Sequence, residues 1–473
     1  MSERASGSVS KNHAVDMALA KLHRKLGSKV ASSDELCAPY ATDDTGIEGR
    51  VDAVVLAETT GDIQKAVQIA GETGCPIVPR AGGSGRTGGA VPILGGIVLC
   101  TKGLNSVVDF DRKEGTAVVG PGMVLDDLYS LVESEGWFYP PDPNSSGMCC
   151  VAGTVAENAA GPRAFHYGST RDYVLGIETF LASGEHFFSG RRTKKGVTGY
   201  DTTALLVGSE GTLAAFGDVT LRLVPKPEKV MTLLGLFGDM EAASKAVEGV
   251  VSARLAPRAI EFLDELTLQI MRDHQNPIDQ RAGALLLIEV EGDEDSCLRQ
   301  AERVGHACDE AGALSVEVAQ SESQRNKLWA ARKQMSVAVR AHARHKISED
   351  VVVPRTRLGE LLQAVRRIGE ENRILSLAYG HAGDGNLHVN FLWNQPAEKA
   401  RVEVAIEALF RATMALGGTL SGEHGIGLLK APYLALEQPP AQIELQQRLK
   451  AAFDPKGVMN PGKIFPRRGH GNC

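Results

Sequence analysis

The stretch PRAGGSGRTGGA, residues 79–90, decides the fold of the N-terminal half of this chain. It follows the short apolar run PIV and supplies five glycines, which are Gly82, Gly83, Gly85, Gly88 and Gly89. Successive backbone N–H groups in such a loop form a nest for a pyrophosphate, and Arg80 or Arg86 can add positive charge. The plainer alternative is a flexible glycine turn that binds nothing.

Two common nucleotide motifs do not describe this loop. A Rossmann GxGxxG motif should open a long helix, but AVPILGGIVLC follows here and has the pattern of a loop and a strand. No Gly-Lys-Ser/Thr sequence follows either, so it is not a Walker loop. The loop alone therefore leaves the phosphate nest and the plain glycine turn both open.

Length and composition limit the classes of protein. With 473 residues the chain should form two or three domains, and its net charge of −7 weighs against nucleic acid as the main partner. Eight scattered cysteines without a CxxC pair disfavour an iron–sulfur cluster and fit a reducing compartment. No apolar run is long enough to span a bilayer, and the N-terminus lacks the apolar core of a secretory signal. The expected location is the cytoplasm, with peripheral contact at the inner membrane left open.

The pattern of secondary structure changes along the chain. VDAVVLAE (51–58) and GIVLC (96–100) predict strands, and TGDIQKAVQIAGETG (60–74) predicts a helix with Thr60 as N-cap and Gly74 just past its end. Pro-Lys-Pro at 225–227 predicts a domain boundary. Beyond it, helical segments alternate with strands such as ALLLIEVEG (284–292), which is typical of an antiparallel sheet covered by helices. The Pro- and Gly-rich tail AAFDPKGVMNPGKIF (451–465) predicts a loop.

The stretch GHAGDGNLH, residues 380–388, holds two histidines around a tight turn. ILSLAY before it and LHVNFLW after it predict strands, and GDGN is a strong turn signal, so a hairpin brings His381 and His388 to facing strand ends. Asn390 lies two residues after His388 and shares its face. Two converging imidazoles suit a divalent metal at ~2.0–2.1 Å. The alternative is a pair of surface histidines.

A second unusual stretch is SGEHGIG, residues 421–427, in which Glu423 and His424 stand between glycines. Together with His381 and His388, Glu423 would complete a two-histidine, one-carboxylate set that leaves metal positions open for substrate. Asp384 is the competing ligand by chemistry, and we assign it to shaping the turn instead.

Three further segments carry a resemblance to a known family: residues 140–178, LLVGSEGTL (205–213) and FDPKGVMNPGK (453–463). With the glycine loop, they resemble the FAD-binding oxidoreductases of the vanillyl-alcohol-oxidase and p-cresol-methylhydroxylase type. The more similar branch holds D-lactate dehydrogenases, glycolate oxidase large subunits and D-2-hydroxyglutarate dehydrogenases. The resemblance runs from about residue 35 to 466 and covers several motifs in order.

The resemblance implies an α+β fold in four segments. Residues 1–46 would form an N-terminal lead and helix, and residues 47–226 a two-subdomain FAD-binding domain of p-cresol-methylhydroxylase type. Residues 227–415 would form an α+β substrate cap with a ferredoxin-like antiparallel sheet. Residues 416–473 would form a C-terminal helical segment that returns to the flavin.

The resemblance also implies a set of FAD contacts. Some relatives tether FAD through a histidine of the glycine loop, but this loop has none and Ser84 stands near that place, so noncovalent FAD is expected, with Cys149 and Cys150 near the flavin as the open exception. The implied cofactor residues are Pro79, Arg80, Ala81, Gly82, Gly83, Ser84, Gly85, Thr87, Gly88, Gly89, Pro141, Asp142, Pro143, Gly147, Gly153, Thr154, Asn158, Gly161, Tyr167, Gly168, Ile177 and Asn460.

The resembled branch carries HxGDGNxH and GEHG motifs, which it uses for a metal and a catalytic base. This implies His381, His388 and Glu423 as ligands of zinc, manganese or iron, and His424 as the base. Arg332, Lys346 and Asn390 would bind the substrate, since an arginine is a bidentate partner for a carboxylate. The alternative for Arg332 and Lys346 is a solvated basic helix face.

The implied reaction is oxidation of a D-2-hydroxy acid to the 2-oxo acid, with hydride transfer to flavin N5. D-lactate or glycolate is favoured, because Met335 and Ser336 stand where relatives for D-2-hydroxyglutarate often carry a threonine. D-2-hydroxyglutarate is the second choice. Two other classes stay open: an alkylglycerone-phosphate-synthase-like transferase, and a noncatalytic flavin subunit of a larger complex. The electron acceptor can be a quinone, a cytochrome, an electron-transfer flavoprotein or oxygen, and a homodimer is one possible assembly.

Overall fold

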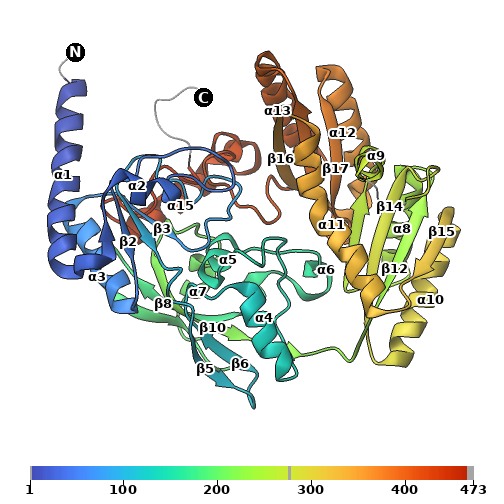
Figure 1. Ribbon diagram of the computed structural model, residues 1–473, viewed down its shortest axis with the longest axis horizontal. Helices are drawn as coiled ribbons and strands as arrows, with labels where there is room; N and C mark the ends of the chain where they lie inside the picture. Colours follow the sequence, from blue (N-terminus) through green and yellow to red (C-terminus); the bar gives the residue numbers. More distant parts are fainter. Residues whose placement is uncertain (1–2, 275–277, 466–473) are drawn as a thin grey trace. The chain divides into compact units, whose positions relative to one another are not determined.

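A computed structural model describes residues 3–274 and 278–465, which form two compact units (Figure 1). The first unit comprises Met1–Ala159, Ser169–Lys226 and Glu423–Cys473, and the second comprises Ala160–Gly168 and Pro227–Gly422. The chain therefore enters the second unit at Pro227 and leaves it after Gly422. A nine-residue excursion, 160–168, also belongs to the second unit.

The first unit contains two main sheets and their covering helices. Its strands are β1 (Val30–Ala31), β2 (Ala53–Leu56), β3 (Ile77–Arg80), β4 (Ile97–Cys100), β5 (Val107–Asp111), β6 (Thr116–Val119), β7 (Trp137–Phe138), β8 (Val174–Phe180), β9 (His186–Gly190), β10 (Ala215–Arg222) and β11 (Val224–Pro225). Its helices are α1 (Glu3–Leu26), α2 (Asp34–Cys37), α3 (Thr60–Thr73), α4 (Leu125–Ser134), α5 (Val151–Glu157), α7 (Thr202–Leu206), α14 (Leu434–Glu437) and α15 (Pro440–Phe453).

The strands of this unit have the order β1-β2-β4-β3 in one sheet and β5-β6-β10-β8-β9 in the other. Strands β2, β4 and β3 run parallel, and α3 connects β2 to β3. The predicted strands 51–58 and 96–100 are confirmed as β2 and β4. Because β3 ends at Arg80, the glycine loop leaves the sheet at the carboxyl end of a buried parallel strand.

Helix α3 is confirmed, but its predicted N-cap is wrong by one residue. The side chain of Thr59, not of Thr60, accepts a hydrogen bond from the Asp62 N–H, and the Asp62 carboxylate accepts one in return from the Thr59 N–H. This reciprocal capping box needs a hydroxyl three residues before a carboxylate, a spacing that only Thr59 has. Gly74 ends the helix with a φ of +73°, as predicted.

The C-terminal segment returns to the first sheet. Met459 forms a parallel bridge with Ile77 of β3, and the Ile77 N–H donates to the Val458 carbonyl over 2.9 Å. The prediction of a loop for 451–465 is wrong for its first three residues, which complete α15. The remainder is a loop whose backbone pairs with the edge of β3, and this pairing fixes the place of Asn460.

The second unit is a seven-stranded antiparallel sheet with helices on both faces. Its strands are β12 (Lys229–Phe237), β13 (Ala259–Leu263), β14 (Ala284–Gly292), β15 (Ala313–Val318), β16 (His345–Val352), β17 (Leu375–His381) and β18 (Asn386–Trp393). Its helices are α6 (Ala164–Tyr167), α8 (Met240–Ser252), α9 (Glu265–Asp273), α10 (Glu294–Glu310), α11 (Glu322–His342), α12 (Leu358–Asn372) and α13 (Lys399–Ala415).

The strand order is β15-β12-β14-β13-β17-β18-β16, and every neighbouring pair is antiparallel. Helices α9 and α11 pack on one face, where Leu268, Met335 and Val339 meet the side chains of Leu377 and Leu392. Helix α12 packs behind β17 on the other face, together with α8 and α13. The predicted α+β architecture is confirmed. We call the seven-stranded antiparallel sheet of the second unit the cap sheet.

The cysteines and the helix lengths bear on the class of protein. Seven cysteines are buried and free, and the eighth, Cys473, lies outside the described residues. Within residues 3–274 and 278–465, none of the helices combines the length and the apolar character that a bilayer crossing needs.

Candidate active site

One face of the cap sheet carries a patch of polar side chains that the strand register brings together. Tyr379 of β17 pairs with His388 of β18, and His388 pairs with Asp350 of β16. Residues directly opposite each other on neighbouring strands point to the same side of a sheet. The next rows add His381, Asn390, Glu261, Ser348 and Lys346 to this face, which we call the histidine face. The face is also the one that α11 covers.

The predicted hairpin is confirmed, and it buries both histidines. His381 and His388 are 3% and 4% exposed, and a ring nitrogen of one lies within 4.8 Å of a ring nitrogen of the other. Their ring centroids are 5.2 Å apart, with the planes at 87°. His388 lies opposite Tyr379 rather than opposite His381, so the two imidazoles converge from positions two residues apart along the face. They are not the solvent-exposed pair of the alternative interpretation.

Arg332 of α11, the helix that packs on this face, points its side chain toward the same residues. Its side chain is 3% exposed, and the guanidinium carbon lies 5.2 Å from the centroid of the Tyr379 ring. Lys346 of β16 lies 6.0 Å from the same centroid and donates hydrogen bonds to the Ser336 and Tyr379 hydroxyls over 3.2 and 3.4 Å. Both cations therefore lie near one buried aromatic ring, and the buried guanidinium of Arg332 is not a solvated helix charge.

Glu261 of β13 links the histidines to the arginine. Its Oε1 lies 2.5 Å from Nδ1 of His381, and its Oε2 lies 2.6 Å from a terminal nitrogen of Arg332. Burial acts to raise the pKa of the Glu261 carboxyl, but the contacts with Arg332 and His381 outweigh burial and lower that pKa overall. The carboxylate is thus ionised where it meets both groups.

Asp350 anchors the point where the chain leaves the second unit. It is fully buried, and its Oδ2 accepts the Gly422 N–H over 2.9 Å and the Ser421 hydroxyl over 3.2 Å. Its Oδ1 accepts the side-chain amide of Asn386 over 2.6 Å. Glu423, the next residue after Gly422, begins the return to the first unit. The candidate ligands His381 and His388 thus lie in one unit, while Glu423 and the candidate base His424 belong to the other.

Two buried oxygens on this face have no hydrogen-bond partner within the described residues. They are Oδ1 of Asn390 and Oγ of Ser348, which lie opposite each other on β18 and β16. The amide nitrogen of Asn390 is held by the His388 carbonyl over 2.8 Å, which turns Oδ1 the other way. Because buried polar atoms are normally satisfied, these two oxygens are acceptors for a water or a ligand.

The glycine loop of the first unit is shaped by close backbone contacts. A Cβ on Gly82 would lie 2.3 Å from the Met148 carbonyl oxygen, and Gly83 and Gly88 have φ angles of +70° and +82°. A side chain at these positions would clash or strain the backbone. Gly85 differs, since the atom nearest to a Cβ there is 3.9 Å away. The conformation of the loop therefore requires glycine at positions 82, 83 and 88.

Several distant segments hold the glycine loop. The Asn460 side-chain amide donates to the carbonyls of Gly89 and Glu210 over 2.8 and 2.7 Å, so the C-terminal return and the segment 205–213 meet there. Thr87 donates its hydroxyl to the His424 carbonyl over 3.1 Å, and its own carbonyl accepts the Leu428 N–H over 2.7 Å. Three of the predicted motifs are thus brought together within the first unit.

The loop 424–427 also rests on two buried carboxyl groups. Glu210 accepts the N–H groups of Ile426 and Gly427 over 2.8 and 2.7 Å. A Cβ on Gly425, whose φ is +79°, would lie 2.3 Å from a Glu157 oxygen and 3.0 Å from a Glu210 oxygen. Burial, and then the nearby Glu210 charge, raise the pKa of the Glu157 carboxyl well above its usual value.

The basic and sulfur groups near the glycine loop already have contacts within the protein. Arg86 is paired with Asp44 at 3.3 Å, and Arg80 lies 5.9 Å over the Tyr40 ring, with burial lowering the pKa of its guanidinium. Burial raises the thiol pKa of Cys149 and Cys150 to about 12 and about 11. Both cysteines are protonated at neutral pH and are poor nucleophiles.

The implied cofactor residues do not all fall in one unit. Gly161, Tyr167 and Gly168 belong to the excursion that joins the second unit, and the remainder lie in the first. Tyr167 donates its hydroxyl to Glu291 of β14, and the ring of His166 lies 3.2 Å from the Ala256 carbonyl. The structure therefore anchors this short segment on the cap sheet.

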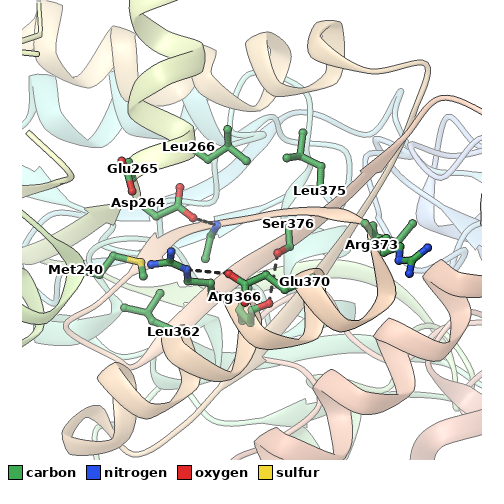
Figure 2. A pocket seen from close by; sticks show the side chains of 14 residues that line it. Met240, Asp264, Glu265, Leu266, Leu362, Arg366, Glu370, Arg373, Leu375 and Ser376 are labelled. Carbon is green, nitrogen blue, oxygen red and sulfur yellow. Dashed lines mark hydrogen bonds and ion pairs between the residues drawn. The ribbon is translucent and has the colours of Figure 1, made fainter.

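A pocket of about 360 Å³ lies on the opposite face of the cap sheet (Figure 2). Ser376 and Ala378 line it, and they alternate along β17 with Leu377 and Tyr379 of the histidine face. Asp264 caps α9 and accepts the Ala378 N–H over 2.5 Å, and Arg366 pairs with Glu370 at 3.1 Å, as the dashed lines in Figure 2 show. Because Asp264 is already held by Thr267 and Ala378, and Arg366 by Glu370, we assign the pocket no role.

Sequence reasoning missed several residues of the site. Glu261, Asp350, Tyr379, Glu157 and Glu210 were not singled out, although each lies beside a predicted site residue or the glycine loop and all but the half-buried Glu157 are buried. A signal was available for the first two, because an acidic side chain interrupts the apolar runs AIEFL and ISEDVVV. A charge within a buried strand is rarely tolerated without a partner or a function.

Family comparisons agree with this arrangement. A model of the FAD binding domain matches residues 51–188, and a model of the C-terminal domain of FAD linked oxidases matches residues 226–464. The chain belongs to the FAD-linked oxidases, and it is an FAD-dependent oxidoreductase with a fold of p-cresol-methylhydroxylase type.

Individual proteins similar to this chain include two curated relatives and one solved structure. Glycolate oxidase subunit GlcD of Bacillus subtilis is 39% identical over 88% of this chain and 89% of its own length. D-lactate dehydrogenase of Anaerostipes hadrus is 32% identical over 92% of this chain and 94% of its own length. Among solved structures, p-cresol methylhydroxylase with substrate bound superposes with a TM-score of 0.81 at 16% identity, covering 97% of this chain and 98% of that one. That last likeness concerns the fold alone.

Proposed function

We propose that this chain oxidises a D-2-hydroxy acid to the 2-oxo acid, with D-lactate or glycolate as the favoured substrate. Its relatives include proteins named glycolate oxidase subunit and D-lactate dehydrogenase, which agree with a small hydroxy acid. Bound FAD supplies the acceptor for the substrate hydride. The residues of the chain itself must bind and orient the acid.

The observation that carries the proposal is the buried Arg332 on the same sheet face as His381 and His388. A guanidinium at 3% exposure on an aromatic ring gives a 2-hydroxy acid a fixed partner for its carboxylate. The unsatisfied oxygens of Asn390 and Ser348 on that face are acceptors for a substrate hydroxyl or an ordered water. A small, polar, anionic molecule fits these groups better than an apolar one.

We infer that His381, His388 and Glu423 hold a divalent metal. Two buried imidazoles with nitrogens within 4.8 Å fit a metal, and Asp350 anchors Gly422 immediately before Glu423. Two histidines and one carboxylate suit zinc, manganese or iron. When bound, such an ion would polarise the substrate hydroxyl.

We infer that His424 takes the proton of the hydroxyl. Its backbone is held to the glycine loop by Thr87, and Gly425 after it leaves room for the Glu157 and Glu210 carboxyls. An imidazole titrates near neutral pH, and a placed base contributes roughly 10²–10⁴-fold. The FAD is held noncovalently, because residues 79–90 contain no histidine and the Cys149 and Cys150 thiols stay protonated.

The remaining assignments extend the same proposal. Residues 47–226 serve as the FAD-binding domain, 227–415 as the substrate cap, 416–473 as the segment that returns to the flavin, and 1–46 as a lead. A quinone, a cytochrome or an electron-transfer flavoprotein takes the electrons onward. The proposed location is the cytoplasm, with peripheral contact at the inner membrane and assembly as a homodimer left open.

D-2-hydroxyglutarate is the second candidate, because Lys346 places another cation 6.0 Å from the Tyr379 ring that Arg332 contacts. A substrate with two carboxylates would use both cations. Met335 of α11 is buried in the core between that helix and this face, which favours a smaller acid.

The test is anaerobic absorbance of the metal-loaded holoprotein mixed in turn with D-lactate, L-lactate, glycolate and D-2-hydroxyglutarate. Rapid bleaching of the oxidised flavin band by D-lactate or glycolate, but not by L-lactate, is the expected result, and a chelator should abolish it. Bleaching by D-2-hydroxyglutarate alone would move that acid to first place. A bound flavin that none of the four acids bleaches would overturn the proposal.

A further inference from the structure

Glu261 occupies an unusual position for a strand residue. It is 0% exposed in the middle of AIEFL, and its two oxygens have different partners. Oε1 lies 2.5 Å from Nδ1 of His381, while Oε2 lies 2.6 Å from Arg332. One carboxylate therefore contacts both a candidate metal ligand and the candidate binder of the substrate carboxylate.

We propose that Glu261 is a positioning residue that sets His381 for metal binding and Arg332 for substrate binding at the same time. This inference rests on the proposed function, since it takes the roles of the two partners from there. Glu261 itself touches neither metal nor substrate. It acts through the two side chains that it holds.

The argument for His381 is one of ring tautomers. A carboxylate oxygen 2.5 Å from Nδ1 accepts the proton that this nitrogen carries, and the lone pair of the neutral ring is then on Nε2. A histidine ligand whose second nitrogen donates to a carboxylate is both oriented and made more basic. With a neutral amide at residue 261, that orientation would have no ionised acceptor behind it.

The argument for Arg332 is one of charge and direction. At 3% exposure the guanidinium depends on a counter-charge, and Glu261 supplies it. Within the described residues, the Nε–H of Arg332 has no hydrogen-bond partner. Glu261 thus occupies one edge of the guanidinium and leaves a donor for a second carboxylate, which is the group that a 2-hydroxy acid brings.

The same sheet provides a matched control. Glu289 on neighbouring β14 is also buried, at 2% exposure, and it also binds an arginine, with Oε1 2.7 Å from Nε of Arg325. Its other partners include Trp329 and Thr232, and no histidine is among those the structure gives it. Glu261→Gln and Glu289→Gln remove the same charge from the same sheet, but only the first faces His381.

The experiment measures two independent quantities on the FAD-loaded protein and its variants: the metal Kd on the metal-free form and the kinetics on the metal-loaded form. Zn²⁺ or Mn²⁺ is titrated by calorimetry to give the metal Kd, and steady-state oxidation of D-lactate gives KM and kcat separately. For Glu261→Gln we expect the metal Kd to weaken roughly 10–100-fold, with a rise in KM for the acid and an unchanged flavin content. For Glu289→Gln we expect a lower melting temperature with metal Kd and KM within about threefold of wild type.

Each outcome decides between the claims. Wild-type metal Kd and KM in Glu261→Gln would overturn the inference, and so would equal losses in both glutamine variants, which indicate a general effect of removing a buried charge. Should Glu261→Gln fail to fold, Glu261→Asp keeps the charge but shortens its reach, and the same metal loss is expected there. Failure of the wild-type protein to bind metal or to oxidise any hydroxy acid would instead contradict the proposed function, and the inference would fail with it.

Discussion

The glycine loop of the first unit and the histidine face of the second unit are built in opposite ways. The loop 79–90 depends on backbone geometry: Gly82 and Gly83 allow contacts that no side chain would permit. The histidine face depends on buried charge: Glu261 and Asp350, both 0% exposed, fix the groups around His381 and His388. A site built from backbone should be damaged by substitutions that add a side chain. A site built from side chains should be damaged by substitutions that remove a charge or a ligand atom.

The largest effect is expected from Gly82→Ala. Its Cβ would lie 2.3 Å from the Met148 carbonyl and 3.1 Å from the Cys149 Cα, which are backbone atoms that cannot move alone. We expect the free energy of unfolding to fall by about 3 kcal/mol and bound flavin to be largely lost. Denaturant unfolding and the ratio of flavin to protein absorbance measure both.

Gly85→Ala is the matched control in the same loop. The nearest atom to its Cβ is 3.9 Å away, so stability should change by less than about 1 kcal/mol in either direction. Equal damage from both alanines would mean that the loop is sensitive to any side chain and not to the Met148 contact.

The second effect tests the histidine face. His388→Ala should lower kcat/KM by at least about 10²-fold and weaken metal binding, while flavin content stays at the wild-type level. His345→Ala is its control, because His345 lies on neighbouring β16 but is exposed and stacks on Trp393 at 5.2 Å. Near wild-type kinetics are expected there. Loss of flavin from His388→Ala would contradict the separation of the two sites.

A third effect concerns pH, through the Glu157 carboxyl beneath Gly425. Its pKa is raised well above the ordinary 4.5 by burial and by Glu210. The stabilising contribution of a group whose folded pKa is raised is fully present below the unfolded value and is lost as the pH rises through the folded value. We expect Glu157→Gln to remove that loss, so that the variant becomes more stable than wild type at high pH by on the order of 1 kcal/mol. Melting temperatures that follow pH identically in both proteins would contradict this account.

The smallest effect is expected from the helix that supports the glycine loop. Thr59→Ala removes the acceptor of the Asp62 N–H and should cost about 1 kcal/mol of unfolding free energy. Thr60→Ala, the residue that the sequence pattern indicated, should cost less than about 0.5 kcal/mol. Chemical denaturation of the two variants side by side distinguishes them, and the reverse order would restore the cap predicted from sequence.

The sequence allowed more of the first region to be predicted than of the second. Glycine spacing and the order of motifs indicated the loop, because backbone demands leave a direct mark on residue type. Strand alternation also indicated the hairpin with His381 and His388. The partners of these histidines could not be found in this way, since Glu261 lies 120 residues before His381 and only the pairing of β13 with β17 makes them neighbours.

The cap of α3 illustrates the same limit at short range. Thr59 and Thr60 are both acceptable N-caps by type, and the choice depends on which hydroxyl reaches the Asp62 N–H. Likewise, the ion pair of Arg86 with Asp44, 42 positions earlier, is a contact that the local pattern does not indicate. Local sequence patterns thus predict helices, strands and turns, whereas the partners of individual side chains depend on contacts that the pattern does not contain.

The central claim is that the first unit holds the flavin while the histidine face of the second selects the acid. The most direct measurement is stopped-flow reduction of the flavin in Arg332→Met by D-lactate, glycolate and D-2-hydroxyglutarate, compared with wild type. The account predicts a normally loaded, oxidised flavin that is reduced at least about 10²-fold more slowly at low acid concentration, because the carboxylate has lost its buried partner. Flavin reduction at the wild-type rate, or a protein that no longer holds FAD, would contradict it.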